Sequence, residues 1–139
     1  MQSNNITMSQ KLVEMPDFKL TQLRYESETW KRLLEFMMDE NIHLKYRLSD
    51  VLKNNFDKQF LDQLENFQSS FVKEDNLISV LRNDVAELDK LLVWEVFEDG
   101  KIQKDIDKKV KITRNNINNA EKQFSQLKSS FISSLSENM

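Results

Sequence analysis

Cysteine is absent from the sequence, and glycine, proline and histidine occur once each among 139 residues. Without cysteine the chain has no disulfide, no thiol nucleophile and no cysteine metal ligand, although this absence does not indicate a compartment. Strands and hairpins need frequent turns that glycine and proline favour, and the only residues of these two types are Pro16 and Gly100. The composition therefore argues against an all-β or an α/β fold.

Long apolar runs are also missing, since 31% of the residues are charged and no window of about eighteen residues is apolar enough to cross a bilayer. Residues 1–10 are polar and have neither a basic start nor an apolar run, so they do not resemble a secretory signal. We therefore expect a soluble, cytoplasmic protein without a membrane partner. The formal net charge of −3 argues against nucleic-acid binding, which usually needs a basic surface.

What the sequence does contain is a regular hydrophobic pattern. Hydrophobic residues make up 39% of the chain, enough for one core. They recur at alternating spacings of three and four, the heptad pattern of helices packed along one another. The first stripe consists of Leu20, Leu23, Ser27, Trp30, Leu34, Met37, Asn41, Leu44, Leu48 and Val51. The second consists of Phe60, Leu64, Phe67, Phe71, Glu74, Ile78, Leu81, Val85, Leu88 and Leu92. The third consists of Ile102, Ile106, Val110, Thr113, Ile117, Ala120, Phe124, Leu127, Phe131 and Leu135.

These stripes predict three helices, over about residues 20–53, 57–98 and 102–135. Asp57 is a good N-cap for the second helix, and Gly100 can close that helix and begin a tight helical hairpin. The polar stretch 73–76 interrupts the second stripe, but without glycine or proline there we expect the helix to continue through it.

The fold class predicted from these elements is all-α, an up-down-up antiparallel bundle of three long amphipathic helices, coiled-coil-like, which dimerisation can complete. Residues 1–18 have no sustained periodicity and contain Pro16, so we expect a flexible N-terminal arm. Residues 19–139 then form a single helical-bundle domain.

Two blocks of charge support a hairpin of the second and third helices. The acidic block consists of Asp84, Glu87, Asp89, Glu95, Glu98 and Asp99. The basic block consists of Lys101, Lys104, Lys108, Lys109, Lys111 and Arg114. Folding back at Gly100 sets the blocks side by side. An exposed ion pair is worth at most ~1 kcal/mol, so the blocks are expected to fix the register of the hairpin more than its stability.

Asn41 and Glu74 are the long polar residues of otherwise apolar stripes, and the predicted hairpin places them at nearly the same height. If they meet, with Gln123 or Lys128 from the third helix, they form a buried polar layer that fixes register. The alternative is that both side chains reach water.

Glu40 and His43 have the Glu-x-x-His spacing found in di-iron carboxylate bundles, which places a carboxylate and an imidazole on one helical face. Such a site needs a second pair and further glutamates, and this chain has one histidine. We therefore interpret His43 as a surface residue that Asp39, four residues earlier, can pair with. The two residues are only weak candidates for a metal site, and no cofactor is expected.

Val93, Trp94 and Phe97 belong to a segment that is apolar nearly all the way round the helix. In a three-helix monomer they would point outward, and large apolar residues gathered on a surface commonly form a contact site. The alternative is that the N-terminal arm covers them with Leu12, Val13 or Phe18.

Residue patterns typical of catalysis are missing, because the sequence has no phosphate-binding glycine loop, no nucleophile elbow and no paired histidine or cysteine. We expect a non-enzymatic helical scaffold, adaptor or regulatory interaction domain that binds a protein partner or itself as a homodimer, through the outer faces of the first and second helices. The alternatives are a metal- or ligand-binding bundle that uses Glu40 and His43, and a peripheral membrane-associated protein that uses Trp94 and Phe97.

Overall fold

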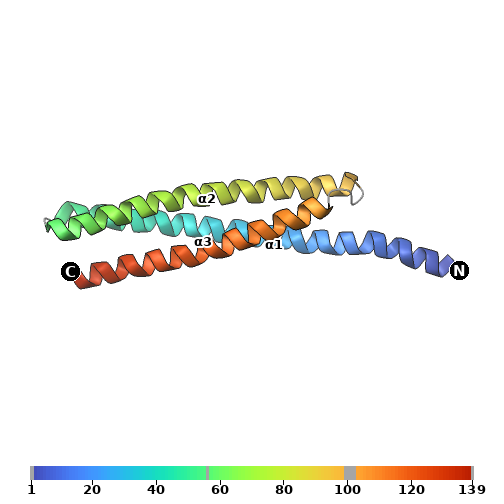
Figure 1. The fold of residues 1–139 in the computed structure, drawn as a ribbon, viewed down its shortest axis with the longest axis horizontal. Helices are drawn as coiled ribbons and strands as arrows, with labels where there is room; N and C mark the ends of the chain where they lie inside the picture. Colours follow the sequence, from blue (N-terminus) through green and yellow to red (C-terminus); the bar gives the residue numbers. More distant parts are fainter. Residues whose placement is uncertain (1, 56, 99–102, 139) are drawn as a thin grey trace.

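The computed structural model describes the backbone of residues 2–55, 57–98 and 103–138, and side chains within 18–55, 57–95 and 103–138. Three helices make up the fold: α1 (Gln2–Asn54), α2 (Lys58–Glu98) and α3 (Gln103–Asn138). They run up, down and up beside one another (Figure 1), and the parts of the chain that the structure describes contain no strand. The predicted all-α, three-helix bundle is confirmed.

The core consists of the three predicted stripes. Every position of the first stripe is buried, including the polar Ser27 and Asn41. In the second and third stripes Phe67 and Leu127 are only partly buried, and Ile102 lies outside the described residues. Each fully buried Leu or Phe side chain stabilises the fold by roughly 1.5–3 kcal/mol relative to exposure, so the side chains that line the bundle hold the helices together.

Aromatic rings join α2 to α3 near the start of α2. The ring centroids of Phe67 and Phe131 are 5.3 Å apart, and those of Phe71 and Phe131 are 5.1 Å apart, both edge to face. This is the arrangement that the ring quadrupoles favour. The contact fixes the C-terminal part of α3 against α2.

The second helix begins and continues as predicted. Asp57 caps it, because the backbone N–H of Gln59 donates to Asp57 Oδ1 at 3.0 Å. The helix is unbroken through residues 73–76.

The first helix begins earlier than predicted, at Gln2 instead of about residue 20. Proline inside a helix removes one backbone hydrogen bond, yet the backbone is helical on both sides of Pro16. The Lys, Leu, Glu and Met residues just before it are good helix formers, which favours continuation. The predicted boundary after residue 18 is therefore not a break in secondary structure. Figure 1 shows that this end of α1 extends past the neighbouring ends of α2 and α3.

The charged blocks of α2 and α3 meet in part. Lys109 pairs with Glu87 across the hairpin at 3.1 Å. Arg114 instead pairs with Glu26 of α1, and Asp89 pairs with Lys31 of α1. Two charged residues that we expected to pair within the hairpin of α2 and α3 therefore pair with α1.

Candidate functional site

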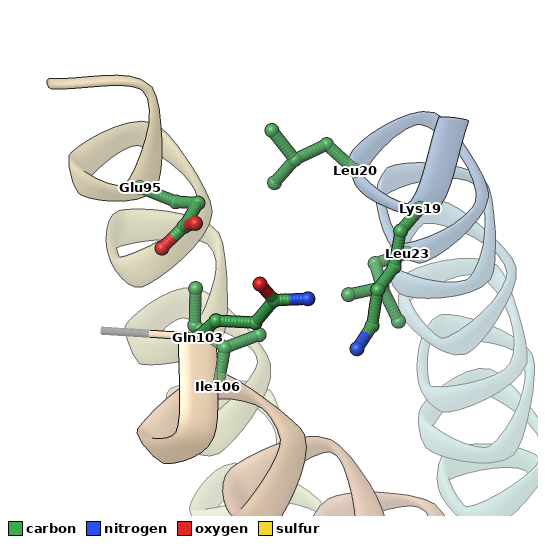
Figure 2. A pocket seen from close by; sticks show the side chains of 6 residues that line it. All are labelled: Lys19, Leu20, Leu23, Glu95, Gln103 and Ile106. Carbon is green, nitrogen blue, oxygen red and sulfur yellow. The ribbon is translucent and has the colours of Figure 1, made fainter. Parts of the chain in front are cut away.

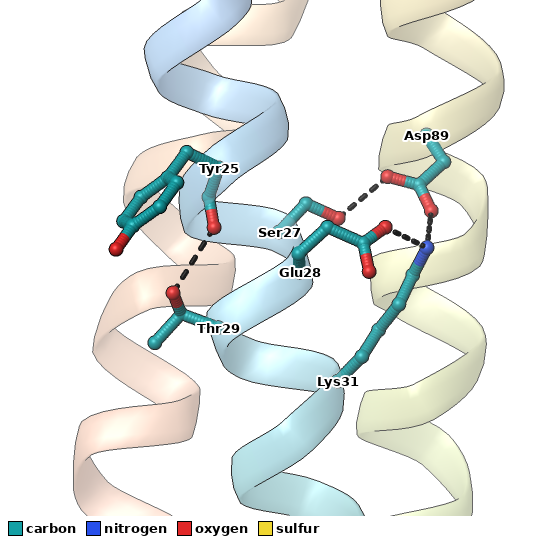
Figure 3. Close-up of polar contacts among 6 residues, drawn as sticks. All are labelled: Tyr25, Ser27, Glu28, Thr29, Lys31 and Asp89. Atoms are coloured by element: carbon teal, nitrogen blue, oxygen red, sulfur yellow. Dashed lines mark hydrogen bonds and ion pairs between the residues drawn. The ribbon is translucent and has the colours of Figure 1, made fainter.

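A polar contact that we call the first aspartate bridge joins α1 to α2. The Ser27 hydroxyl donates to Asp89 Oδ1 at 2.5 Å, and Lys31 Nζ lies 2.5 Å from Asp89 Oδ2 (Figure 3). Glu28 also accepts from Lys31, at 3.0 Å. The pKa of Lys31 is raised above its ordinary value, chiefly by the bond to Asp89 and then by the bond to Glu28. The bridge satisfies a serine that is fully buried in the core.

The same arrangement recurs two heptads along, as the second aspartate bridge. Asn41 Nδ2 donates to Asp75 Oδ1 at 2.7 Å and to the backbone carbonyl of Phe71 at 3.0 Å. Lys45, four residues after Asn41, pairs with the other oxygen of Asp75. In both bridges one aspartate of α2 therefore joins a buried polar residue of α1 to the lysine one turn later.

The two bridges specify one register between the antiparallel α1 and α2. Midway between them Arg82 lies over Met38, with Arg82 Nη1 3.4 Å from the sulfur. Sliding α2 by one heptad in either direction would set Arg82 opposite Lys31 or opposite Lys45. It would also leave a buried polar group without its aspartate. Two positive charges side by side and an unpaired buried polar group are both unfavourable. The bridges therefore stabilise the observed register, and these contacts disfavour registers shifted by one heptad.

Asn41 and Glu74, predicted to form a buried polar layer, are both buried, with 0% and 7% of their surface exposed. Asn41 is bonded to Asp75 rather than to Glu74. Among the described residues, Asn41 Oδ1 and Glu74 Oε2 have no hydrogen-bond partner. Burial raises the pKa of Glu74 above its usual range, and the neighbouring Asp75 charge raises it further. The predicted polar layer therefore contains two buried oxygen atoms without a hydrogen-bond partner among the described residues. Lys128, which we expected to join this layer, pairs with Glu40.

Glu40 and His43, the weak metal candidates, are not brought together with other ligands. Glu40 Oε2 lies 2.5 Å from Lys128 Nζ, and His43 is exposed. Within the described ranges no group of three histidine, aspartate or glutamate side chains is close enough to hold a metal ion.

Three ion pairs set the position of α3 along α1. Lys19 pairs with Asp107, Glu26 with Arg114, and Glu40 with Lys128. In each pair the partners have the same separation of 88 residues, as parallel helices in a single register require. The Glu26–Arg114 pair is bidentate, with distances of 2.7 and 2.8 Å, and its bond raises the pKa of Arg114.

Val93 and Trp94, the predicted contact residues, are exposed at the C-terminal end of α2, by 52% and 59% of their surface. The side chain of Phe97 lies outside the described residues, as do those of Leu12 and Val13. Phe18, the third residue proposed as a cover, is itself 67% exposed. The described part of α1 therefore leaves Val93 and Trp94 in contact with solvent.

A second exposed aromatic surface lies on the side of α1 opposite its core stripe, and the sequence interpretation missed it. The residues are Phe18, Tyr25, Phe36 and Tyr46, which are between 58% and 72% exposed. Figure 3 shows the Tyr25 ring directed away from α2. Three of these four aromatic residues could have been found from the sequence, because Phe18, Tyr25 and Tyr46 share one outer heptad position.

A void between the three helices, near the N-terminal end of α3, is very small. Figure 2 shows a void where Glu95 of α2 and Gln103 of α3 point toward Lys19, Leu20 and Leu23 of α1. Its volume is about 10 Å³, about the size of one water molecule, whereas small-molecule sites enclose roughly 300–1,000 Å³. Larger hollows, such as the one beside Ser79 and Asn83, are open to solvent. Neither the void nor this hollow is a closed pocket large enough for a small-molecule ligand.

Comparison with protein-family models, with curated protein sequences and with solved structures finds no significant match to this chain. Among the helical segments that the structure describes, none is long and apolar enough to cross a membrane.

Proposed function

We propose that this chain is a non-enzymatic helical interaction protein, a scaffold or adaptor that binds a protein partner through the outer faces of α1 and α2. The observation that supports the proposal most directly is the exposure of Trp94 and Val93, adjacent residues that are each more than half exposed on α2. The core is already filled by the three stripes, so these side chains are not needed to complete it.

The chemistry of this surface suits a protein partner. Tryptophan is enriched among the residues that dominate binding energy at interfaces, because it buries a large area with few rotatable bonds. Val93 adds a branched apolar group beside it, while Lys90 supplies a charge one turn earlier at the rim. An apolar centre with a charged rim is the usual anatomy of a specific protein interface.

The polar groups inside the bundle serve its structure. Ser27 and Asn41 are bonded to aspartates of α2, and Glu40 is bonded to Lys128. These partners account for Ser27, for the amide nitrogen of Asn41 and for Glu40 without a substrate or a metal. A cytoplasmic location and the absence of enzymatic activity are parts of the same proposal.

Photo-crosslinking in cells tests the proposal. A photoreactive phenylalanine analogue placed at Trp94 is expected to give a discrete covalent adduct with a protein. The same analogue at Glu65, an exposed position of α2 away from Val93, serves as the matched control and is expected to give none. Val93→Asp should abolish the adduct at position 94 while leaving the melting temperature unchanged within about 2 °C. Equal labelling at both positions, or none at either, contradicts the proposal.

A lipid surface is the competing partner for an exposed tryptophan, which favours the membrane–water interface. Sedimentation with anionic phosphatidylserine vesicles at low salt separates the two cases. We expect the purified protein to stay in the supernatant. Binding to vesicles that Trp94→Ala abolishes would replace the protein partner with a membrane.

A further inference from the structure

The outermost heptad position of α1 forms a row of exposed side chains that we call the outer row. Its members, one every seven residues, are Phe18, Tyr25, Arg32, Asp39, Tyr46 and Lys53. All six are exposed, and the fourth aromatic residue of this surface, Phe36, lies between Arg32 and Asp39. The row extends along roughly 50 Å of helix at about 1.5 Å per residue. Neither α2 nor α3 covers it.

The outer row is complementary to itself when its direction is reversed. A two-fold axis between Arg32 and Asp39 places each of these residues opposite the other on a second copy. The same axis places Tyr25 opposite Tyr46, and Phe18 opposite Lys53. The two copies of Phe36 meet beside the axis. A symmetric interface requires this relationship, in which residue i contacts residue j and residue j contacts residue i.

From this symmetry we propose that the outer row is the interface of an antiparallel homodimer, in which α1 packs against α1 of a second copy of this chain. The inference rests on the proposed function and names the partner of the α1 face. A parallel pair would set Arg32 against Arg32 and Asp39 against Asp39. The charges therefore select the antiparallel arrangement as well as the partner.

The groups at the centre of the row are available to a second copy. The only hydrogen bond that the described side chains give Arg32 is to the exposed hydroxyl of Thr29, at 3.3 Å. Asp39 is exposed. The Tyr25 ring is also exposed and points away from α2 (Figure 3). Arg32 and Asp39 together lie between Tyr25 and Tyr46 in the row, and arginine and tyrosine are both enriched at interface centres.

The available area matches a dissociable dimer. Four aromatic side chains per copy are between 58% and 72% exposed. Taking about 200 Å² for each ring, two copies bring together on the order of 1,000 Å² of aromatic surface. Specific interfaces bury about 1,200–2,000 Å² in total, which the polar members of the row can supply. Because this area lies at the low end of the range, we expect a dimer that dissociates on dilution rather than an obligate one.

A charge swap tests the pairing. Sedimentation equilibrium of the purified full chain, over roughly 1–200 µM, is expected to show a monomer–dimer equilibrium. Arg32→Asp and Asp39→Arg should each raise the dissociation constant at least about tenfold, because each sets like charges opposite one another twice. The double variant Arg32→Asp/Asp39→Arg should restore it to within about threefold. Lys122→Asp, an equivalent reversal on the exposed face of α3, is the matched control and should change nothing.

Circular dichroism measures the helical content of each variant. Unchanged helical content shows that a variant fails to dimerise because its interface has changed and not because it is unfolded. A wild-type chain that is monomeric at 200 µM overturns the inference, as does a double variant as weak as the single ones. The proposed function is tested separately at Trp94 on α2. An adduct at that position together with a monomeric wild type would reject the homodimer and keep the interaction protein.

Discussion

Asp75 and Asp89 occupy equivalent positions on α2, two heptads apart, and each divides its two carboxylate oxygens between a buried polar residue and a lysine of α1. Both lysines follow their polar residue by four positions, so they lie one turn further along the same side of α1. Bonds to an ionised carboxylate are stronger than neutral ones. The same polar arrangement, an aspartate of α2 bonded to a buried polar residue and a lysine of α1, therefore occurs twice in the interface between α1 and α2.

Removal of an aspartate bridge is expected to destabilise the fold. Asp75→Ala leaves the Nδ2 group of Asn41 with only the Phe71 carbonyl and leaves Lys45 unpaired. We expect the free energy of unfolding to fall by about 1–3 kcal/mol. Urea unfolding followed by circular dichroism measures it. Glu35→Ala, at an exposed site of α1, should change it by less than about 0.5 kcal/mol, and a similar loss in both variants would show that the bridge has no special role.

Glu74 should make stability depend on pH. Its folded pKa is raised by burial and by Asp75, so between the ordinary value of 4.5 and the raised value the folded chain holds a proton that the unfolded chain has released. The stability of the wild type therefore falls as pH rises through this interval. Glu74→Gln removes this contribution, so its melting temperature should exceed that of the wild type at pH 7, and the difference should shrink toward pH 4.

Differential scanning calorimetry from pH 4 to pH 7 measures the effect. Glu65→Gln, an exposed glutamate on the same helix, is the control and should follow the wild-type curve. A difference between Glu74→Gln and wild type that is constant with pH would mean that the Glu74 carboxyl titrates normally.

Asn41→Leu should raise the melting temperature while making the association state less uniform. Leucine gives up the Asn41 bonds to Asp75 and to the Phe71 carbonyl, but it extends the apolar stripe and removes a buried carbonyl oxygen without a partner among the described residues. Asp75 keeps its pair with Lys45, so Asn41→Leu leaves no buried side chain of α1 with an unmet polar group, unlike Asp75→Ala. Apolar replacement of a buried polar residue commonly stabilises a bundle and weakens its register. A rise of a few degrees is expected for a chain of this length. Light scattering after size exclusion reports uniformity, and a lower melting temperature with unchanged association would reject the hypothesis.

The positions of the core residues were predictable because a heptad repeat that continues over several turns places all its apolar residues on one face of the helix, and that face must be buried. Ser27 and Asn41 illustrate this, since the repeat placed them inside although their side chains are polar. The start of α1 was not predictable in the same way. Pro16 argued for a boundary, but the helix continues through it, which the good helix formers just before the proline favour despite the loss of one hydrogen bond.

The polar partners were harder to predict than the core. Arg114 lies in a basic block beside an acidic one, yet it bonds to Glu26 of α1. In a three-helix bundle each flanking residue lies near two neighbours, and the sequence does not say which it will contact. The aspartate bridges had a detectable signal, a polar core residue followed four positions later by lysine, twice with the same spacing. The exposed aromatic residues needed the outer heptad positions to be examined as carefully as the inner ones.

The constant separation of 88 residues between ion-paired positions of α1 and α3 restricts how the chain can change in length. Inserting one residue in the middle of α1 would rotate everything beyond it by about 100° and break the pairs on one side of the insertion. Seven residues inserted there would keep the faces but shift the pairing, unless α2 and α3 gained seven as well. Insertions and deletions in related sequences should therefore fall at the helix ends and turns, or occur as whole heptads in all three helices together.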